Sequence, residues 1–269
     1  MCMFNSKIGF IGCGNIANAI IGGAVGVGYI KYENLYLFDT DSDKIAPFLE
    51  KGAAVCGSAK ELVSLCDFVF LTVKPQIYEA VLSSIADSAS GTCFISVAAG
   101  ITVDYVKKLL GFDAPVIRVM PNTPLLCGKG ASALVKRAPV TEERFEFIKG
   151  LFACSGECVS VDEKLINTVT AISGSAPAYV LRFAKALIDF GVQNGLSDED
   201  AEKLVLATVS GSGELAINSD CSIDTLIKNV TSPNGTTYAG LCSMDKTGFD
   251  ASLTAALEAT LQRAEELTK

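Results

Sequence analysis

The chain has 269 residues and carries 22 Lys and Arg against 30 Asp and Glu, a formal net charge of −8. Apolar residues make up 49% and charged residues 19%, which excludes a largely disordered chain and leaves room for two domains. The acidic balance argues against a nucleic-acid partner, and the absence of histidine excludes Ser-His-Asp hydrolysis and most zinc enzymes, so no metal site is expected.

Short apolar runs alternate with helical patterns over residues 1–161. We expect strands at 7–11, 35–38, 68–73, 92–97, 115–119 and 157–161. We expect helices at 43–51, 59–65, 76–86, 103–110 and 141–152. Alternation of strand and helix indicates an α/β domain of βαβ units, with a parallel sheet and helices on both faces.

The uncharged stretch at 8–30 has the length of a membrane span. Seven of its residues are glycine, and Asn15 and Asn18 add polar groups. A buried strand, a glycine-rich turn and a packed helix explain the stretch better than a span or a signal peptide. No membrane association is therefore expected.

The character of the chain changes after about residue 162. Apolar residues recur at helical spacing from Val180, Asn194-Gly195 ends that helix, and Ser197 is a candidate N-cap for the next. Residues 204–217 are apolar or small on nearly every face, and a helix of that kind must be buried all round. We therefore expect an all-helical domain that is covered by a second subunit.

The residues after the first predicted strand fit the pattern G-x-G-x-x-A at Gly12, Gly14 and Ala17. Glycine permits the tight turn and the close approach of a pyrophosphate, and the helix start offers free N–H groups. Asp39, at the end of the next strand, suits the ribose hydroxyls of a dinucleotide, and no Arg follows it at 40–43 to hold a 2′-phosphate. NADH is therefore predicted to be used better than NADPH. The alternative is a plain strand–helix turn with a surface Asp.

Four further loops carry polar or small residues. They are 71–76, where Lys74 either meets a phosphate or is simply solvated, and 119–124, 173–179 and 229–237. The last has three Thr, a Ser and an Asn-Gly turn ahead of a helix, a natural cradle for a small carboxylate. Each alone is more often a turn, but their combination indicates a site.

These motifs together resemble the pyrroline-5-carboxylate reductase family, along the whole chain. The resemblance implies a Rossmann-like NAD(P)-binding domain at 1–161 and an all-helical dimerisation and substrate domain at 162–269. It implies NADH- or NADPH-dependent reduction of L-1-pyrroline-5-carboxylate to L-proline, the last step of proline biosynthesis, by homodimers that often assemble into decamers. The sequence departs from the family at Ala176, where Gly is usual, and at Asp220, where Glu is frequent.

The resemblance also implies roles for individual residues. Thr237 is expected to hydrogen-bond the ring nitrogen of the substrate, and Asp220 is the acidic position near it. Backbone N–H groups of Gly235 and Thr236 are expected to hold the substrate carboxylate with Ser232, and Ser175 is a further substrate residue. The expected cofactor-binding residues are Gly12, Cys13, Gly14, Asn15, Ile16, Ala17, Asp39, Val73, Lys74, Pro75, Ala98 and Asn122.

Two other functions stay open. A β-hydroxyacid dehydrogenase has a similar amino-terminal half, and Lys164 or Lys185 would be its base, but the surrounding motif does not match. A non-catalytic, cofactor-binding regulatory relative is the second, and the intact 231–237 loop speaks against it. The ten cysteines include no C-x-x-C pair and sit mostly in apolar runs, so reduced thiols and a cytoplasmic location are expected.

Overall fold

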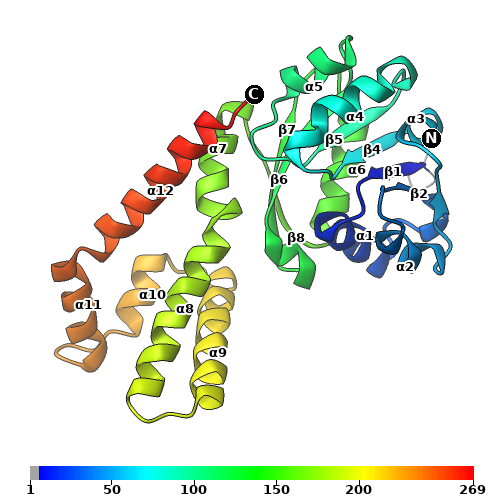
Figure 1. Ribbon diagram of the computed structural model, residues 1–269. Helices are drawn as coiled ribbons and strands as arrows, with labels where there is room; N and C mark the ends of the chain where they lie inside the picture. Colours follow the sequence, from blue (N-terminus) through cyan, green and yellow to red (C-terminus); the bar gives the residue numbers. More distant parts are fainter. Residues whose placement is uncertain (1–5) are drawn as a thin grey trace. The chain divides into compact units, whose positions relative to one another are not determined.

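A computed structural model describes residues 6–269, so Cys2 lies outside the described part of the chain. The chain folds into two compact units (Figure 1). The first runs to Ser175 and also includes Thr260–Lys269, and the second is Ala176–Ala259. The sequence predicted a domain boundary after residue 161, which would assign the segment 162–175 to the second domain. The domain bounds 1–161 and 162–269 remain a prediction.

The first unit is built on an eight-stranded sheet in the order β3-β2-β1-β4-β5-β6-β7-β8. The strands are β1 Ile8–Ile11, β2 Leu35–Phe38, β3 Ala54–Val55, β4 Phe68–Leu71, β5 Cys93–Ser96, β6 Val116–Pro121, β7 Gly130–Lys136 and β8 Gly156–Ser160. Each predicted strand is present with its ends shifted by no more than two residues.

The expectation of a purely parallel sheet is wrong at one strand. β7, which the sequence did not predict, pairs antiparallel with β6, whereas all other pairs are parallel. The short helical turn Thr123–Cys127 and Gly128, at φ 72°, reverse the chain directly after β6. A connection of that length allows only an antiparallel neighbour, because a parallel one needs a long crossover.

Helices cover both faces of the sheet. They are α1 Asn15–Gly26, α2 Ala46–Leu49, α3 Ala59–Leu65, α4 Tyr78–Ile85, α5 Val103–Leu110, α6 Glu142–Ala153 and α7 Ile166–Val169. One core cluster joins the sheet to α1, α2 and α6, a second joins it to α3, α4 and α5, and a small third one joins β7 to Ile166 of α7. This arrangement confirms the predicted Rossmann-like layers.

The last residues of the chain pack on the loop that follows β5. Lys269 N–H donates to the Gly100 carbonyl at 2.8 Å, and the Thr102 hydroxyl donates to the Lys269 carbonyl at 2.5 Å. A Cβ on Gly100 would lie 2.5 Å from the carbonyl oxygen of Leu267, so the two segments are in direct contact. The first unit is thus made of two separate stretches of chain.

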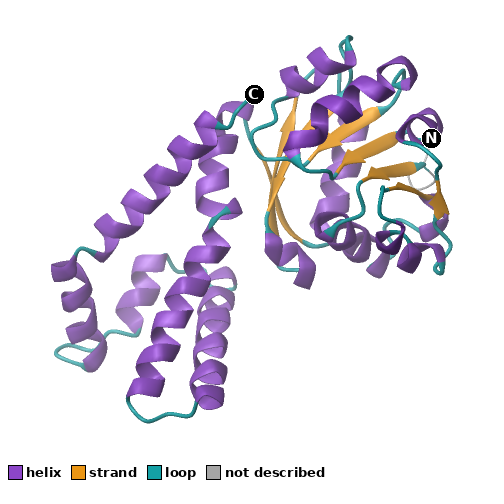
Figure 2. Cartoon of the chain, in the orientation of Figure 1, coloured by secondary structure: helices purple, strands orange, loops and turns teal. Residues whose placement is uncertain are grey.

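The second unit contains only helices among its elements (Figure 2). They are α8 Ala176–Gln193, α9 Asp198–Ile217, α10 Ile223–Asn229, α11 Thr236–Thr247 and the first part of α12 Phe249–Glu266. The Ser197 side chain accepts from Asp200 N–H, which confirms the predicted N-cap of α9.

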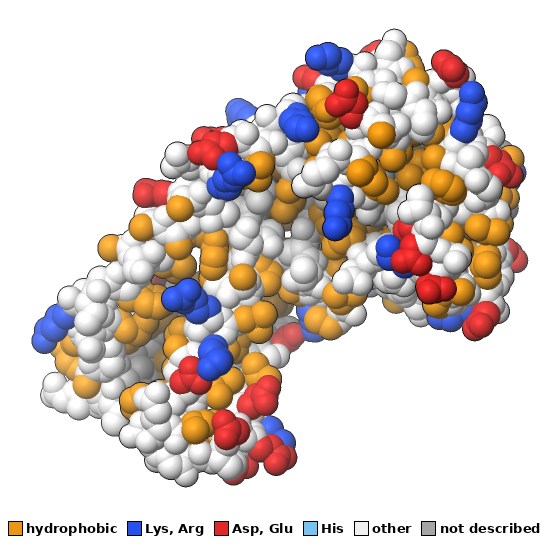
Figure 3. Space-filling model, in the orientation of Figure 1, with side chains coloured by type: hydrophobic (Ala, Val, Ile, Leu, Met, Phe, Trp, Pro, Cys, Tyr) orange, Lys and Arg blue, Asp and Glu red, His pale blue; other side chains and the backbone are white. Residues whose placement is uncertain are grey.

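Many large apolar side chains of this unit lie at the surface of the single chain (Figure 3). On α8 and α9 they are Val180, Leu181, Phe183, Leu187, Phe190, Leu204, Leu206, Leu215 and Ile217. Between α8 and α12 there is in addition a largely apolar pocket of about 560 Å³, lined in part by Phe183 and Phe249. Exposed apolar surface on this scale is typical of an association surface. Among residues 6–269, no helix combines the length and the hydropathy needed to cross a membrane.

Candidate active site

The predicted cofactor residues gather at one edge of the sheet. The parallel register of β2, β1, β4, β5 and β6 brings their carboxyl ends to the same edge. Gly12, Asp39, Val73, Ala98 and Asn122 each follow one of these strands within two residues. The carboxyl edge of such a sheet is where open α/β folds bind their ligands.

Gly12 makes the turn between β1 and α1, and two observations require glycine there. Its φ of +95° is a conformation that other residues rarely adopt. A Cβ would lie 2.9 Å from Val73 Cγ1 and 3.0 Å from the carbonyl carbon of Thr72. The end of β4 therefore packs directly against the turn.

The peptide unit between Gly12 and Cys13 is bonded at both ends. Its carbonyl accepts from the Thr72 hydroxyl at 2.5 Å, and its N–H donates to Asp39 Oδ2 at 2.7 Å. The Asn18 amide donates to the next two carbonyls, of Cys13 and Gly14, at 3.2 and 3.1 Å. Burial, and after it the Asp39 charge, raises the pKa of the Cys13 thiol to about 12, so this thiol is no nucleophile at neutral pH.

The N-terminus of α1 is open to a ligand. Gly14 is the N-cap, no side chain caps the helix, and a Cβ on Gly14 would meet no atom within 4 Å. The first N–H groups of a helix have no partner inside it and attract an anion. A tight turn, open space over Gly14 and an uncapped 12-residue helix therefore fit the pyrophosphate of a dinucleotide.

Asp39 lies beside this turn in a partly buried position. Its Oδ1 accepts from Asp41 N–H at 3.0 Å, and Lys44 Nζ lies 3.9 Å from the same atom. Each carboxylate oxygen so far has one backbone donor, which leaves a second lone pair on each for ribose hydroxyls.

The remaining cofactor candidates differ in their surroundings. Lys74 is exposed, and Ala98 is buried. The Asn122 side chain accepts from Ala131 N–H at 2.8 Å and donates to Ser173 Oγ at 3.3 Å, so its amide is bonded within the unit.

The predicted substrate loop forms a tight turn ahead of α11. Gly235 N–H donates to the Ser232 carbonyl at 3.0 Å, and Asn234 has a φ of 58°, as in a type II turn with Pro at its second position. A Cβ on residue 235 would lie 2.2 Å from the Ser232 hydroxyl and 3.1 Å from the Ser232 carbonyl oxygen, so a larger residue here would require the Ser232 side chain to move.

This geometry corrects one expectation. The Gly235 N–H, expected to hold a carboxylate, is already bonded inside the turn. The donors offered to an anion are instead those of Thr236 and Thr237, in the first turn of α11, whose N-cap Gly235 supplies no side-chain bond.

The remaining predicted substrate residues are Thr237, Asp220 and Ser175. Thr237 is exposed on α11, and Asp220 is exposed in the loop between α9 and α10, both in the second unit. Ser175 is the last residue of the first unit and follows a π-helical turn, Thr170–Gly174. Such turns occur frequently at functional sites.

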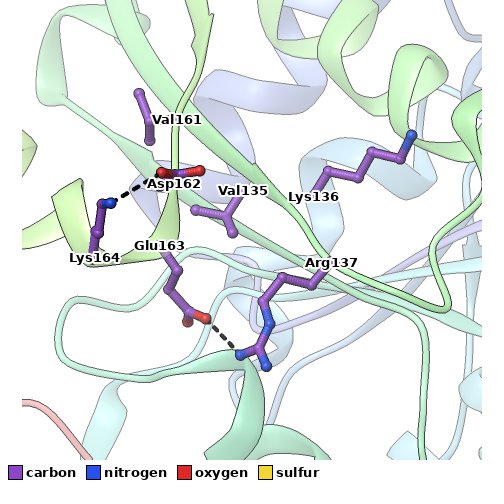
Figure 4. Close-up of a pocket in the computed structure, with 7 residues that line it drawn as sticks. All are labelled: Val135, Lys136, Arg137, Val161, Asp162, Glu163 and Lys164. Carbon is purple, nitrogen blue, oxygen red and sulfur yellow. Dashed lines mark hydrogen bonds and ion pairs between the residues drawn. The ribbon is translucent and has the colours of Figure 1, made fainter.

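A pocket of about 360 Å³ at the carboxyl ends of β7 and β8 is not part of this site (Figure 4). Its charges are paired: Arg137 Nη1 donates to Glu163 Oε2 at 2.8 Å, and Lys164 Nζ lies 3.5 Å from Asp162. β7 ends beside the beginning of β6, so the pocket lies away from the carboxyl edge of the parallel strands.

Two residues with contacts in the glycine turn were missed by sequence reasoning. Asn18 is one helical turn into α1, and Thr72 directly follows the apolar strand Phe68–Leu71. The signal for Thr72 was present, because a hydroxyl closes an otherwise apolar run at the sheet edge where ligands bind. No role was predicted for it.

Comparisons with known proteins agree along the chain. Residues 163–267 match the family model "Pyrroline-5-carboxylate reductase dimerisation", and residues 7–100 match "NADP oxidoreductase coenzyme F420-dependent". The chain is 37% identical to the pyrroline-5-carboxylate reductase of Pseudomonas aeruginosa and 35% identical to that of Escherichia coli, over 99% and 98% of this chain and 98% of each relative.

Solved structures give the same result. The pyrroline carboxylate reductase of Plasmodium falciparum, crystallised with NADP bound, has a TM-score of 0.89 at 33% identity, over 99% of this chain and all of that chain. The pyrroline-5-carboxylate reductase of Coxiella burnetii has a TM-score of 0.93 at 32% identity, over 98% and 99%.

Proposed function

Because the chain belongs to the pyrroline-5-carboxylate reductase family and reduces L-1-pyrroline-5-carboxylate to L-proline with NAD(P)H, closing proline biosynthesis, we propose how its residues divide this work. The turn at Gly12 binds the dinucleotide, and the 232–237 loop binds the imino acid. The alternatives, a β-hydroxyacid dehydrogenase and a non-catalytic relative, are not favoured by the full-length matches.

The reaction requires little acid–base catalysis from the protein. The bound reduced nicotinamide supplies the hydride for the C=N carbon. A protonated imine is already a strong electrophile, so a chain without histidine is sufficient. The protein's tasks are to orient the ring and to stabilise its charges.

Substrate binding is assigned to the first turn of α11. The N–H groups of Thr236 and Thr237, with the Ser232 hydroxyl, hold the carboxylate, and the helix N-terminus favours its negative charge. The Thr237 hydroxyl hydrogen-bonds the ring nitrogen. Ser175 and the acidic Asp220 have the supporting roles that the family resemblance assigns. The observation that carries this proposal is the helix start at Thr236, which no side chain caps and which directly follows the tight turn at Ser232–Gly235.

Cofactor choice, assembly and location complete the proposal. Asp39 binds the ribose hydroxyls of NADH, which makes NADH the better reductant. The exposed apolar faces of α8 and α9 pair two copies of the chain as a homodimer, and dimers assemble further into a decamer. The described cysteines are all free, which supports a reducing, cytoplasmic location.

Two variants of Thr237 test the catalytic assignment. Thr237→Ala removes a bond to a charged group and is expected to lower kcat/KM for the imino acid about 10- to 100-fold, whereas Thr237→Ser keeps the hydroxyl and most of the activity. Binding of NADH, measured by fluorescence titration, should not change in either. Wild-type kinetics in Thr237→Ala would leave the loop as a carboxylate site only, with the ring nitrogen bonded by other groups.

A further inference from the structure

The glycine motif does not by itself fix the orientation of the peptide unit between Gly12 and Cys13. A peptide unit next to a glycine at φ +95° can rotate with little steric resistance, because one of its neighbours has no side chain. Rotation of the Gly12–Cys13 unit would exchange the positions of a carbonyl dipole and an N–H dipole at the entry to α1. An anion site at a helix start needs that orientation to be fixed.

The structure fixes it from both neighbouring strands. β1 lies between β2 and β4, and the residue directly after each of these two strands has a side chain that reaches the same peptide unit. Asp39 accepts the N–H of this unit at 2.7 Å from the β2 side, and Thr72 donates to its carbonyl at 2.5 Å from the β4 side. The Thr72 oxygen is also 3.1 Å from the Ile11 carbonyl, so its proton is held inside the turn.

We propose that Thr72 is a positioning residue for the dinucleotide: with Asp39 it locks the Gly12–Cys13 peptide and so aims the free N–H groups of α1 at the pyrophosphate. This role depends on the proposed binding of the dinucleotide at the Gly12 turn. Thr72 touches neither the reacting ring nor the imino acid in this account. Its loss therefore weakens dinucleotide binding and leaves the chemical step unchanged.

The chain offers a matched control at the opposite edge of the sheet. Thr92 precedes β5, is buried, and places its hydroxyl 3.2 Å from the Val63 carbonyl and 3.1 Å from the Cys66 carbonyl. Thr72→Val and Thr92→Val thus remove the same kind of bond with nearly the same change in shape. Only the first lies at the cofactor edge.

The test uses the intact protein and NADH, or NADPH if that binds more tightly. In fluorescence titrations, Thr72→Val is expected to raise Kd about tenfold, which corresponds to about 1.4 kcal/mol. Thr72→Ser, which restores the hydroxyl, and Thr92→Val should stay within about twofold of the wild type, while Thr92→Val lowers the melting temperature as much as Thr72→Val. In steady-state assays, KM for the dinucleotide rises in Thr72→Val, and kcat and KM for the imino acid do not.

Three results would overturn the inference. An unchanged Kd in Thr72→Val, beside a wild type that binds, refutes the positioning role alone. An equal rise in Thr92→Val shows that Thr72 acts only through general stability. A wild type that binds neither dinucleotide refutes the proposed cofactor site, and this role with it.

Discussion

Replacing Glu163 should cost this protein a large part of its stability. Glu163 Oε1 accepts from Arg118 Nη1 at 3.2 Å and from Val103 N–H at 2.8 Å, and Oε2 accepts from Arg137 at 2.8 Å. The Arg118 side chain is only 3% exposed, and burial lowers the pKa of its guanidinium because a charge without a partner is unfavourable there.

The size of the effect follows from these contacts. At 3.2 Å and an effective dielectric constant of about 20, the attraction between the charges of Arg118 and Glu163 is about 5 kcal/mol, most of it offset by their desolvation. Removing one partner leaves the other charge buried, so Glu163→Ala should lower the free energy of unfolding by about 3–5 kcal/mol. Glu163→Gln keeps an acceptor for Val103 N–H and should lose less.

Urea unfolding followed by circular dichroism at fixed protein concentration measures this loss. The control is Glu142→Ala, which removes the exposed ion pair with Lys136 and should cost at most about 1 kcal/mol. If Glu163→Ala costs no more than Glu142→Ala, the buried pair does not stabilise the fold and the reasoning is wrong.

Three further outcomes are expected. Asp39→Asn removes the charge but keeps an acceptor for Cys13 N–H, so the preference for NADH over NADPH in kcat/KM should fall about tenfold; a wild type that prefers NADPH tenfold would contradict the role of Asp39. Leu206, 43% exposed in the single chain, lies on the apolar face of α9 that we propose pairs two copies, so Leu206→Asp should prevent self-association in light scattering, and a stable, active wild-type monomer would refute that surface. Burial raises the pKa of the Cys93 thiol from 9.0 to about 12, so its contribution to stability is complete below pH 9 and is lost as the pH rises from 9 towards 12, by up to about 1.4 kcal/mol per pH unit. Cys93→Ala should therefore flatten the fall of the unfolding free energy above pH 9, and an unchanged slope would show that the thiol is not buried in solution.

Sequence reasoning predicted the parts of this fold whose residues have one strong local preference. The glycine turn was found because Gly12 and Gly14 stand between an apolar strand and a helix, and Ser197 was found because a serine ahead of acidic residues favours an N-cap. These preferences act within a few residues, so one sequence is sufficient to find them.

The elements that were missed depend on distant partners. β7 contains Gly, Ala and Ser, which are weak strand formers, and it forms because the exposed edge of β6 is next to it. The Gly235 N–H was predicted to bind a ligand, whereas in the structure it donates to the Ser232 carbonyl. That bond forms only because Asn234 adopts a positive φ, which the sequence did not indicate. Thr72 was passed over because its role depends on the strand that lies beside it, 60 residues away in the chain.

The first unit is made of two separate stretches of chain, and this affects how the protein can be divided into fragments. In its loop at Gly100–Thr102, the Gly100 carbonyl accepts from Lys269 N–H and the Thr102 hydroxyl donates to the Lys269 carbonyl. Thr102 and Lys269 are 167 residues apart in the chain. A fragment that stops at Ser175 would leave those backbone groups without partners and Thr102, the N-cap of α5, without its acceptor. We expect such a loop to close late in folding, because contacts of long sequence separation form at the greatest entropic cost. The nucleotide half of the molecule is therefore finished only after the whole helical half has been synthesised.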